Sequence, residues 1–285
     1  MRTAMQLMPK KWKQSFKQLG LMTRYCANAR CGRGFLTASS VLRRSESYLL
    51  NRTEWFCSPR CLESELACRF ERVRSTGASA VSPTRMPLGL ILLGRGLFED
   101  EQLRDAIALQ QRTGQRIGAC LCSTGAATEQ DILSGLSAQW ASPVFPAHRI
   151  QKGCSSLIPA ALLREHAMLP VHFTAASRNL YVAFAQGVDY AALYAIEQML
   201  DCHTEACVVP DRVIFDEIEK RSLTCENERA LRYPESAAET ARIIVAYAKQ
   251  CGAENVRYVS TGKDLWVRVV GEDGFMDITF HKAQP

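Results

Sequence analysis

The 285-residue sequence has no apolar run of membrane-spanning length, and its first residues do not show the pattern of a secretory signal peptide. It also lacks the Gly-x-x-x-x-Gly-Lys-Ser/Thr motif for nucleotide phosphates, because Gly262-Lys263 is followed by Asp264 and has no glycine at the required upstream position. No nucleophile beside a base and no open metal position is visible. These absences argue against a motor or another enzyme, and we expect a non-catalytic, cytoplasmic protein.

Hydrophobic residues and cysteines, by contrast, are plentiful. Hydrophobic residues make up 47% of the chain, which at this length predicts roughly two to four small domains rather than one. Twelve cysteines are present, and eight of them are scattered along the chain. This distribution favours a reducing compartment and one metal site over a framework of disulfides.

The net charge of +6 is concentrated at the N-terminus. Residues 1–24 carry six basic side chains and no acidic one; without these six, 29 Lys and Arg balance 29 Asp and Glu. Apolar residues of the same arm share one helical face: Met5, Met8, Trp12, Phe16 and Leu19. The pattern predicts a basic amphipathic helix for an anionic membrane surface or a partner groove. The alternatives are a frayed tail, or an extension upstream of a translation start at Met22.

Four cysteines form two close pairs, Cys26-x4-Cys31 and Cys57-x3-Cys61. Four thiolates at such spacing are the soft ligands of a tetrahedral structural zinc, and the 25 residues between the pairs are enough for a hairpin. Glycines beside Cys31 allow a zinc knuckle. The alternative is four buried, reduced cysteines without metal.

The second cysteine pair opens a predicted helix, with Pro59 in its first turn and an apolar face formed by Leu62, Leu66 and Phe70. The run Phe56-Cys57-Ser58-Pro59-Arg60-Cys61 resembles an FCS or MYM-type zinc finger. That resemblance implies a treble-clef-like module over residues 25–73, and we expect it to fold on its own zinc. A Ser-, Gly- and Pro-containing linker, residues 74–85, follows.

A tandem repeat lies between Pro87 and Gln139. With an offset of 29 positions, equivalent residues are Gly89 and Gly118, Leu92 and Leu121, Gly96 and Gly125, Leu103 and Ile132, Ile107 and Leu136, and Gln110 and Gln139. Each copy has two apolar runs at helical spacing separated by a glycine, which predicts a helix-turn-helix. Thr128 and Asp131 have the spacing of a capping box. We therefore predict a four-helix module over residues 86–142 with a pseudo-two-fold axis.

The repeat resembles the MshE-type N-terminal domain of type II secretion and type IV pilus assembly ATPases. The matching residues are Leu88-Gly89, Leu92-Leu93, Gly96-Leu97-Phe98, Leu103, Ile107 and Gln110, then Arg116-Ile117-Gly118, Leu121-Cys122, Gly125, Ile132, Leu136 and Gln139. The resemblance implies binding of cyclic di-GMP, a two-fold symmetric dinucleotide. The implied ligand residues are Gly89, Leu92, Gly96, Gln110, Arg116, Gly118, Leu121, Gly125 and Gln139.

Two departures from the family pattern bear on this ligand. Pro87 stands where the family has an arginine, and Ala126-Ala127 replaces an aliphatic pair. Loss of a guanidinium that can form two parallel hydrogen bonds should weaken binding, unless Arg85 replaces it. The alternative is that the same residues build a compact pair of helical hairpins that binds no ligand.

The rest of the chain is predicted to be α/β. Residues 143–221 should contain helices at Tyr190–Leu200 and Arg212–Lys220 and strands at Val171–Ala175, Leu180–Ala185 and Thr204–Val209. A resemblance to the second N-terminal subdomain of the same ATPases is carried by Leu157-Ile158-Pro159, His166, Leu169-Pro170-Val171, Leu180-Tyr181-Val182-Ala183 and Val208-Val209-Pro210. Residues 236–285 should form a helix at Ala237–Cys251 and three strands, and they resemble a shortened PAS-like segment. His166 and His172 are interpreted as helix-end or surface residues.

Taken together, the patterns predict an α+β multidomain protein with a zinc module, a tandem-repeat module, a small α/β subdomain and a PAS-like C-terminal segment. We expect an adaptor of a secretion or pilus system that binds zinc, protein components of that system and cyclic di-GMP. The alternative is a zinc-finger protein that binds nucleic acid or another protein. A neutral body argues against nucleic acid, because binding to phosphates needs clustered cations.

Overall fold

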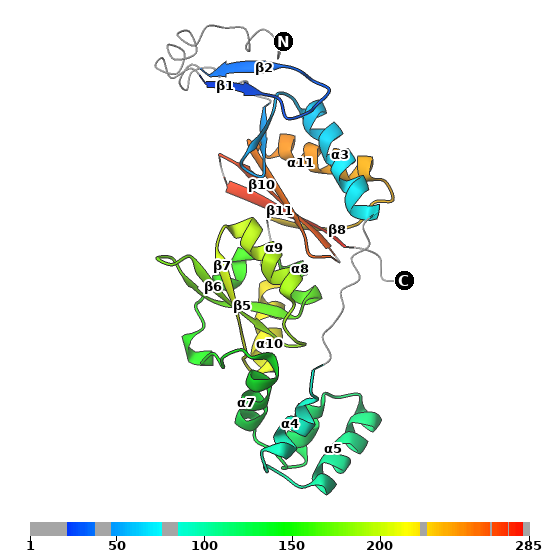
Figure 1. Cartoon of the computed structure of the whole chain (residues 1–285), viewed down its shortest axis with the longest axis vertical. Coiled ribbons are helices and arrows are strands. Elements are labelled where there is room, and N and C mark those ends of the chain that lie inside the picture. The colour runs from blue at the N-terminus through cyan, green and yellow to red at the C-terminus, as the bar shows by residue number, and fades with distance from the viewer. Residues whose placement is uncertain are drawn as a thin grey trace. The chain divides into compact units, whose positions relative to one another are not determined.

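The computed structural model describes residues 22–37, 47–75, 85–222, 227–262, 264–272 and 274–281. They form two compact units, one from residues 22–75 together with 227–281 and the other from residues 85–222 (Figure 1). Both units combine helices with β-sheet, so a mixed α/β protein is confirmed. Within the described ranges, no helix is long and apolar enough to cross a membrane.

Two predicted segments fall mainly outside the described residues. The amphipathic arm is one, since residues 1–21 are not described; residues 22–24 belong to strand β1 (Met22–Tyr25) rather than to a helix. The linker is the other, since residues 76–84 are not described, and residues 74 and 75 still belong to helix α3 (Pro59–Ser75).

The first unit is built on a six-stranded sheet with the order β4-β3-β9-β10-β11-β8. Its strands are β3 (Tyr48–Leu50), β4 (Glu54–Phe56), β8 (Glu228–Arg232), β9 (Asn255–Ser260), β10 (Asp264–Gly271) and β11 (Gly274–His281). β9, β10 and β11 form an antiparallel meander, and β8 lies parallel to β11. The β3–β4 hairpin extends this sheet because β3 pairs in parallel with β9.

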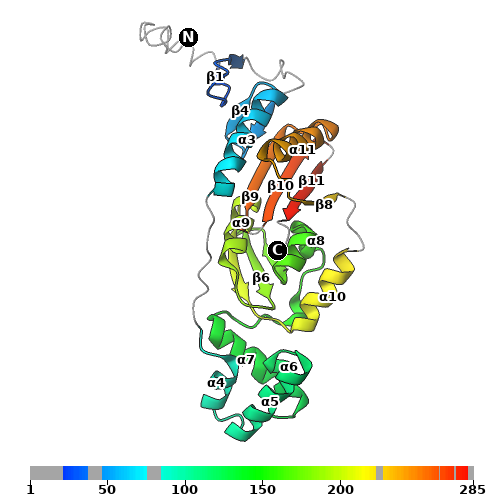
Figure 2. The same cartoon turned by 90° about the vertical axis from the view of Figure 1, so that its right-hand side faces the viewer.

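Two helices from opposite ends of the chain, α3 and α11 (Ala237–Gln250), pack together on one face of that sheet (Figure 2). Their apolar faces share one core with the strands: Leu62, Leu66 and Phe70 from α3, Ile244 and Ala248 from α11, and Val256, Val267 and Phe280 from the sheet. The sequence places residues 25–73 and 236–285 in separate domains. The structure joins them, because neither helix could bury its apolar face without the other segment.

In the second unit, residues 88–140 form four helices: α4 (Leu88–Gly94), α5 (Asp100–Thr113), α6 (Ile117–Ser123) and α7 (Glu129–Trp140). The bounds of α6 are those of α4 moved by 29 positions, and α7 begins 29 positions after α5. α4 packs on α7 and α6 packs on α5, while α4 lies beside α6. Exchange of the two copies leaves this packing pattern unchanged. We call these four helices the helical module.

Glycines at equivalent positions have equivalent roles in the helical module. Gly96 and Gly125 have φ angles of 71° and 73°, and each follows the short first helix of its copy, as predicted. A Cβ atom on Gly89 would lie 2.7 Å from Leu103 Cδ1, and one on Gly118 would lie 3.0 Å from Ile132 Cγ2. These two glycines therefore let the helices of each copy approach closely.

The α/β subdomain of the second unit has a three-stranded sheet with the order β5-β6-β7. Its elements are α8 (Ala160–Glu165), β5 (Met168–Thr174), β6 (Asn179–Phe184), α9 (Tyr190–Leu200), β7 (His203–Cys207) and α10 (Asp211–Ser222), with 3-10 helices at Ala147–Arg149 and Cys154–Leu157. The predicted elements of this region are confirmed. Pro170 lies in β5, next to an irregularity in its pairing with β6.

Candidate metal centre and ligand surface

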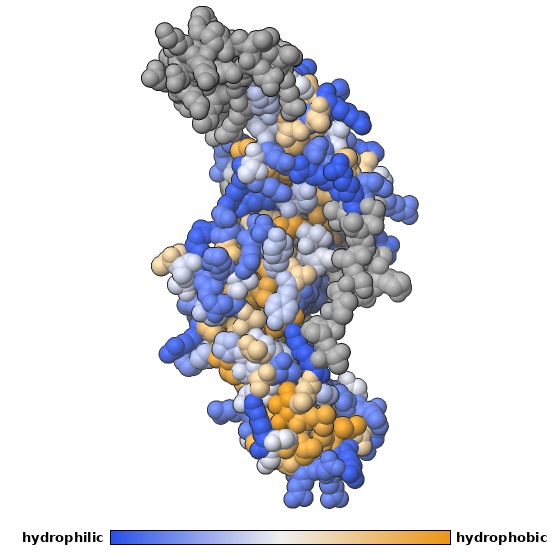
Figure 3. All heavy atoms as spheres, in the orientation of Figure 1, coloured by the Kyte–Doolittle hydropathy of each residue, from blue (hydrophilic) through white to orange (hydrophobic). Residues whose placement is uncertain are grey.

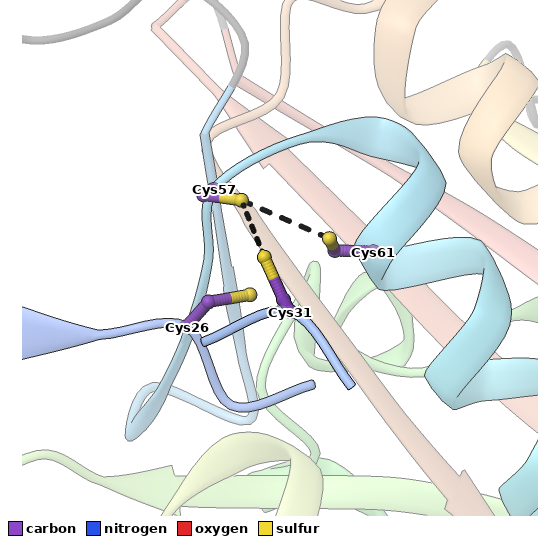
Figure 4. A group of neighbouring side chains, drawn as sticks. All are labelled: Cys26, Cys31, Cys57 and Cys61. Carbon is purple, nitrogen blue, oxygen red and sulfur yellow. Dashed lines mark hydrogen bonds between the residues drawn. The ribbon is translucent and has the colours of Figure 1, made fainter. Parts of the chain in front are cut away.

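The four predicted metal ligands come together in the first unit. Cys26 follows β1, and Cys31 lies in the turn that leads to β2 (Gly34–Thr37). Cys57 follows β4, and Cys61 lies in the first turn of α3. Figure 4 shows the four side chains directed at a common centre, and their sulfur atoms all lie within 4.8 Å of one another.

The first cysteine pair is held by a tight turn with local backbone hydrogen bonds. The amide of Cys26 donates to Arg33 O at 2.9 Å, and the amide of Cys31 donates to Asn28 O at 3.0 Å. Gly32 has a φ of 62°, a conformation that costs glycine little. This turn brings the backbone amide of Arg33 to the Cys31 sulfur, and that hydrogen bond lowers the pKa of the Cys31 thiol.

Asn28 is a residue of this centre that the sequence analysis missed. Its Oδ1 accepts a hydrogen bond from the amide of Arg30 at 2.9 Å, and its Nδ2 donates to Cys61 O at 3.2 Å. The side chain is buried, 8% exposed, and it joins the turn between Cys26 and Cys31, which we call the knuckle turn, to the first turn of α3. The Cys-x-Asn spacing is a weak signal, since asparagine is common in turns.

The distances between the sulfur atoms suit a tetrahedral zinc site. Cys57 Sγ lies 3.5 Å from Cys31 Sγ and 3.7 Å from Cys61 Sγ. A zinc–sulfur bond of about 2.3 Å in a tetrahedron separates its ligands by about 3.8 Å. A disulfide would need sulfur atoms about 2 Å apart, so the described cysteines are free thiols. The donor set and the spacing both fit a structural metal.

Burial raises the pKa of two thiols of the cluster. It raises the pKa of the Cys57 thiol to about 12, and the neighbouring sulfurs act in the same direction. Burial also raises the pKa of Cys26, although backbone amides of Cys57 and Asn28 oppose it by hydrogen bonding to the sulfur. Amides directed at sulfur are the usual supports of metal-bound thiolates.

The predicted ligand residues of the helical module differ in their burial and in their contacts. Leu92 and Leu121 are 0% exposed and belong to its core, so their side chains offer no surface to a ligand. Gly89 and Gly118 are buried in helix contacts. Gln139 Nε2 donates to Met86 O at 2.7 Å and fixes the backbone before α4. Gly96 and Gly125 are exposed, and Gln110 is half-buried.

Arg116, the predicted cation, is engaged by the α/β subdomain. It occupies the N-cap position of α6 with φ −72° and ψ 147°. Its Nη1 donates to Ala185 O at 2.7 Å and forms an ion pair with the carboxylate of Asp211. The guanidinium carbon also lies 5.7 Å from the centroid of the Phe215 ring. Pro87 has the equivalent place before α4, with φ −57° and ψ 140°.

Apolar side chains are exposed on the first copy of the repeat. They are Met86, Leu90, Leu97 and Ile107, with exposed fractions of 63%, 50%, 40% and 40%. Figure 3 shows hydrophobic residues gathered over α4 and α5. The equivalents of Leu90 and Leu97 in the second copy are Ala119 and Ala126, so this surface is not repeated.

His166 is paired with a carboxylate of the same α/β subdomain. His166 is the C-cap residue of α8, as the helix-end interpretation expected, but its side chain is buried. Its Nδ1 lies 2.9 Å from Asp189 Oδ2, and this hydrogen bond lowers the pKa of Asp189. The other oxygen of Asp189 accepts from the amides of Ala191 and Ala192 and caps α9. The pair therefore joins the end of α8 to the start of α9.

Comparison with known proteins confirms the resemblance for about half of the chain, which is similar in sequence to part of a type IV pilus assembly ATPase. The type IV pilus assembly ATPase PilB of Myxococcus xanthus strain DK1622 is 28% identical over 135 residues, which are 47% of this chain and 24% of PilB. The match thus spans about a quarter of PilB.

Two solved structures are also similar. A structure of MshE with cdg is 26% identical, with a TM-score of 0.39, and the match covers 48% of this chain and 99% of that one. A structure of the N-terminal domain of XpsE is 20% identical, with a TM-score of 0.33, and the match covers 47% of this chain and 92% of that one. No protein-family model matches the chain.

Proposed function

We propose that this chain is a non-catalytic adaptor of a type IV pilus or type II secretion assembly system, that its helical module binds cyclic di-GMP, and that Cys26, Cys31, Cys57 and Cys61 hold a structural zinc ion. The observation that carries the ligand proposal is the internal symmetry of the helical module, in which the helices of the two copies begin at equivalent positions and exchange of the copies leaves the packing unchanged. Similarity to PilB supports the assembly system. A cytoplasmic location and protein partners from the same system belong to this proposal.

The zinc part of the proposal rests on the four convergent sulfur atoms. All four tetrahedral positions would be filled by cysteine, so the metal would be structural rather than catalytic. A bound zinc ion would cross-link the knuckle turn to the start of α3. The treble-clef-like order of knuckle, β3–β4 hairpin and helix agrees with such a module.

The ligand part of the proposal assigns different tasks to the two copies. The first copy offers exposed apolar surface at Leu90, Leu97 and Ile107, on which a planar base can lie. The second copy offers Arg116, a cation that can form paired hydrogen bonds with phosphate or with a guanine edge. A symmetric dinucleotide would therefore meet two unlike half-sites and should bind more weakly than to a module with two arginines.

Replacing Pro87 by arginine should tighten the binding of cyclic di-GMP about tenfold to a hundredfold, because a hydrogen bond to a charged group contributes about 1.5–3 kcal/mol. The backbone accepts this change, since Pro87 and Arg116 have nearly the same φ and ψ angles. Isothermal titration calorimetry measures the affinity. Pro87→Ala is the matched control, because it removes the proline ring without adding a cation.

In the same titration, Arg116→Ala should abolish binding, whereas Arg116→Lys should retain a weaker, purely electrostatic contact. The ligand proposal fails if neither the natural chain nor Pro87→Arg binds the dinucleotide at high micromolar concentration. The helical module would then be a docking scaffold whose fold is retained without the ligand.

The purified chain should release no phosphate from ATP above a buffer blank, because these residues contain no loop to hold the phosphates. A coupled phosphate-release assay measures this. Activity that persists through successive purification steps, and that follows the protein on a sizing column, would contradict the adaptor proposal.

A further inference from the structure

Arg116 makes several contacts between the helical module and the α/β subdomain. Three groups of the subdomain surround its guanidinium: the carbonyl of Ala185 after β6, the carboxylate of Asp211 at the start of α10, and the ring of Phe215 one turn further along α10. The Arg116 and Asp211 side chains are 41% and 39% exposed. Both are therefore within reach of solvent and of a ligand.

Arg116 stabilises the charged form of Asp211. Burial raises the pKa of the Asp211 carboxyl, and the charge and hydrogen bond of Arg116 oppose that rise. Among the described residues, Arg116 is the cation paired with this carboxylate. The pair neutralises the charge that Arg116 would otherwise present to an anion.

A second cation, Arg85, also lies against the α/β subdomain near Ala185. A Cβ atom on Gly187 would lie 3.8 Å from Arg85 Nη1, so the Arg85 guanidinium lies beside the loop that begins at Ala185. A further ion pair between the helical module and the subdomain joins Glu129 to Arg212 at 3.0 Å, with side chains 52% and 72% exposed. Because exposed pairs contribute little, this pair is a weaker link than the contacts of Arg116.

We propose that Asp211 competes with the dinucleotide for Arg116, so that ligand binding releases the helical module from the α/β subdomain. This inference rests on the proposed function, because it specifies how the same site is regulated. A carboxylate and a phosphate both accept hydrogen bonds from a guanidinium, and Arg116 Nη1 is already shared between two acceptors of the subdomain. A ligand phosphate that takes the Nη1 donor therefore displaces the carboxylate of Asp211 from it.

The competition lowers the apparent affinity, because only the fraction of molecules with a free Arg116 can bind. Removing the competing charge raises that fraction. For a half-exposed ion pair supported by a carbonyl and a ring, we expect Asp211→Asn to tighten cyclic di-GMP binding about three- to tenfold. Asparagine keeps the size of the side chain at the first position of α10.

The matched control is Asp216→Asn, which makes the same change of charge on the same helix at an exposed residue that does not contact Arg116. Its affinity should stay within about twofold of the natural chain. Phe215→Leu is the second test variant, since it removes the ring beside the guanidinium from a position that is 43% exposed. It should tighten binding by a smaller factor, and it remains informative if Asp211→Asn unfolds.

Calorimetric titrations with cyclic di-GMP should be run on the natural chain and on each variant, and repeated in the Pro87→Arg background, for which we expect the highest affinity. Tighter binding by Asp211→Asn and Phe215→Leu but not by Asp216→Asn supports the competition. Equal or weaker binding by both variants, with measurable binding by the natural chain, overturns the competition and leaves the proposed function standing. Absence of binding in every background overturns both.

Discussion

Cys57→Ser is expected to remove the zinc ion and to destabilise the whole first unit, including residues 227–281, while leaving residues 85–222 folded. Structural zinc contributes on the order of 10 kcal/mol to the folding of finger peptides, which exceeds the stability of many domains. From the sequence alone, we expect Cys57→Ser to unfold only residues 25–73. The structure predicts that the destabilisation reaches residues 227–281 as well, because α3 shares its core with α11 and β3 is hydrogen-bonded to β9.

Metal analysis and hydrogen exchange together measure this outcome. The natural chain should contain one zinc ion per molecule, and Cys57→Ser should contain none. Exchange should accelerate in β3, β9 and β10 together, and remain slow in β6. Cys68→Ser is the control, since Cys68 is an exposed cysteine of α3 outside the cluster. Unchanged zinc content in Cys57→Ser would refute the assignment of the ligands.

Phe70→Ala should lower the free energy of unfolding of the first unit by about 3–5 kcal/mol, the usual cost of removing a buried phenylalanine ring. Phe70 is 0% exposed, and its ring lies edge-on to that of Tyr258 in β9, with centroids 5.2 Å apart. The substitution therefore leaves a cavity between a helix of the N-terminal segment and a strand of the C-terminal one.

The matched variant is Phe184→Ala in β6, which removes an equally buried ring from the second unit. Urea unfolding followed by hydrogen exchange should show that Phe70→Ala weakens residues 227–281 and spares residues 85–222, and that Phe184→Ala does the reverse. If Phe70→Ala leaves the exchange of β9–β11 unchanged, α3 and the C-terminal strands do not form one cooperative unit.

Local signals in the sequence were sufficient for much of the fold. The capping box at Thr128 forms as predicted, with the Asp131 amide donating to Thr128 Oγ1 at 3.2 Å and the Thr128 amide donating to Asp131 Oδ2 at 2.9 Å. The helix expected at Tyr190–Leu200 has those bounds. Caps, turn glycines and apolar periodicity act over a few residues, so they can be recognised without the rest of the chain.

The convergence of the candidate metal ligands was also visible locally. Two close cysteine pairs separated by hairpin length predict a common centre, and the four sulfur atoms do converge. Asn28 was missed because its role depends on a hydrogen bond to Cys61, 33 residues away, which no local pattern specifies. The β8 strand was missed for a similar reason, since its pairing partner β11 lies more than 40 residues further along.

The sequence by itself determined the repeat, its turns and its helices, because short-range backbone preferences and periodic burial set them. Only the tertiary structure decided that the β3–β4 hairpin extends the sheet of the C-terminal segment. The pairing of β3 with β9 joins residues about 200 positions apart, and it uses backbone hydrogen bonds, which do not depend on the identity of the side chains. The tertiary structure also decided which acceptors the Arg116 guanidinium contacts. A guanidinium can serve any nearby acceptor, and the fold places Asp211 and Ala185 beside it.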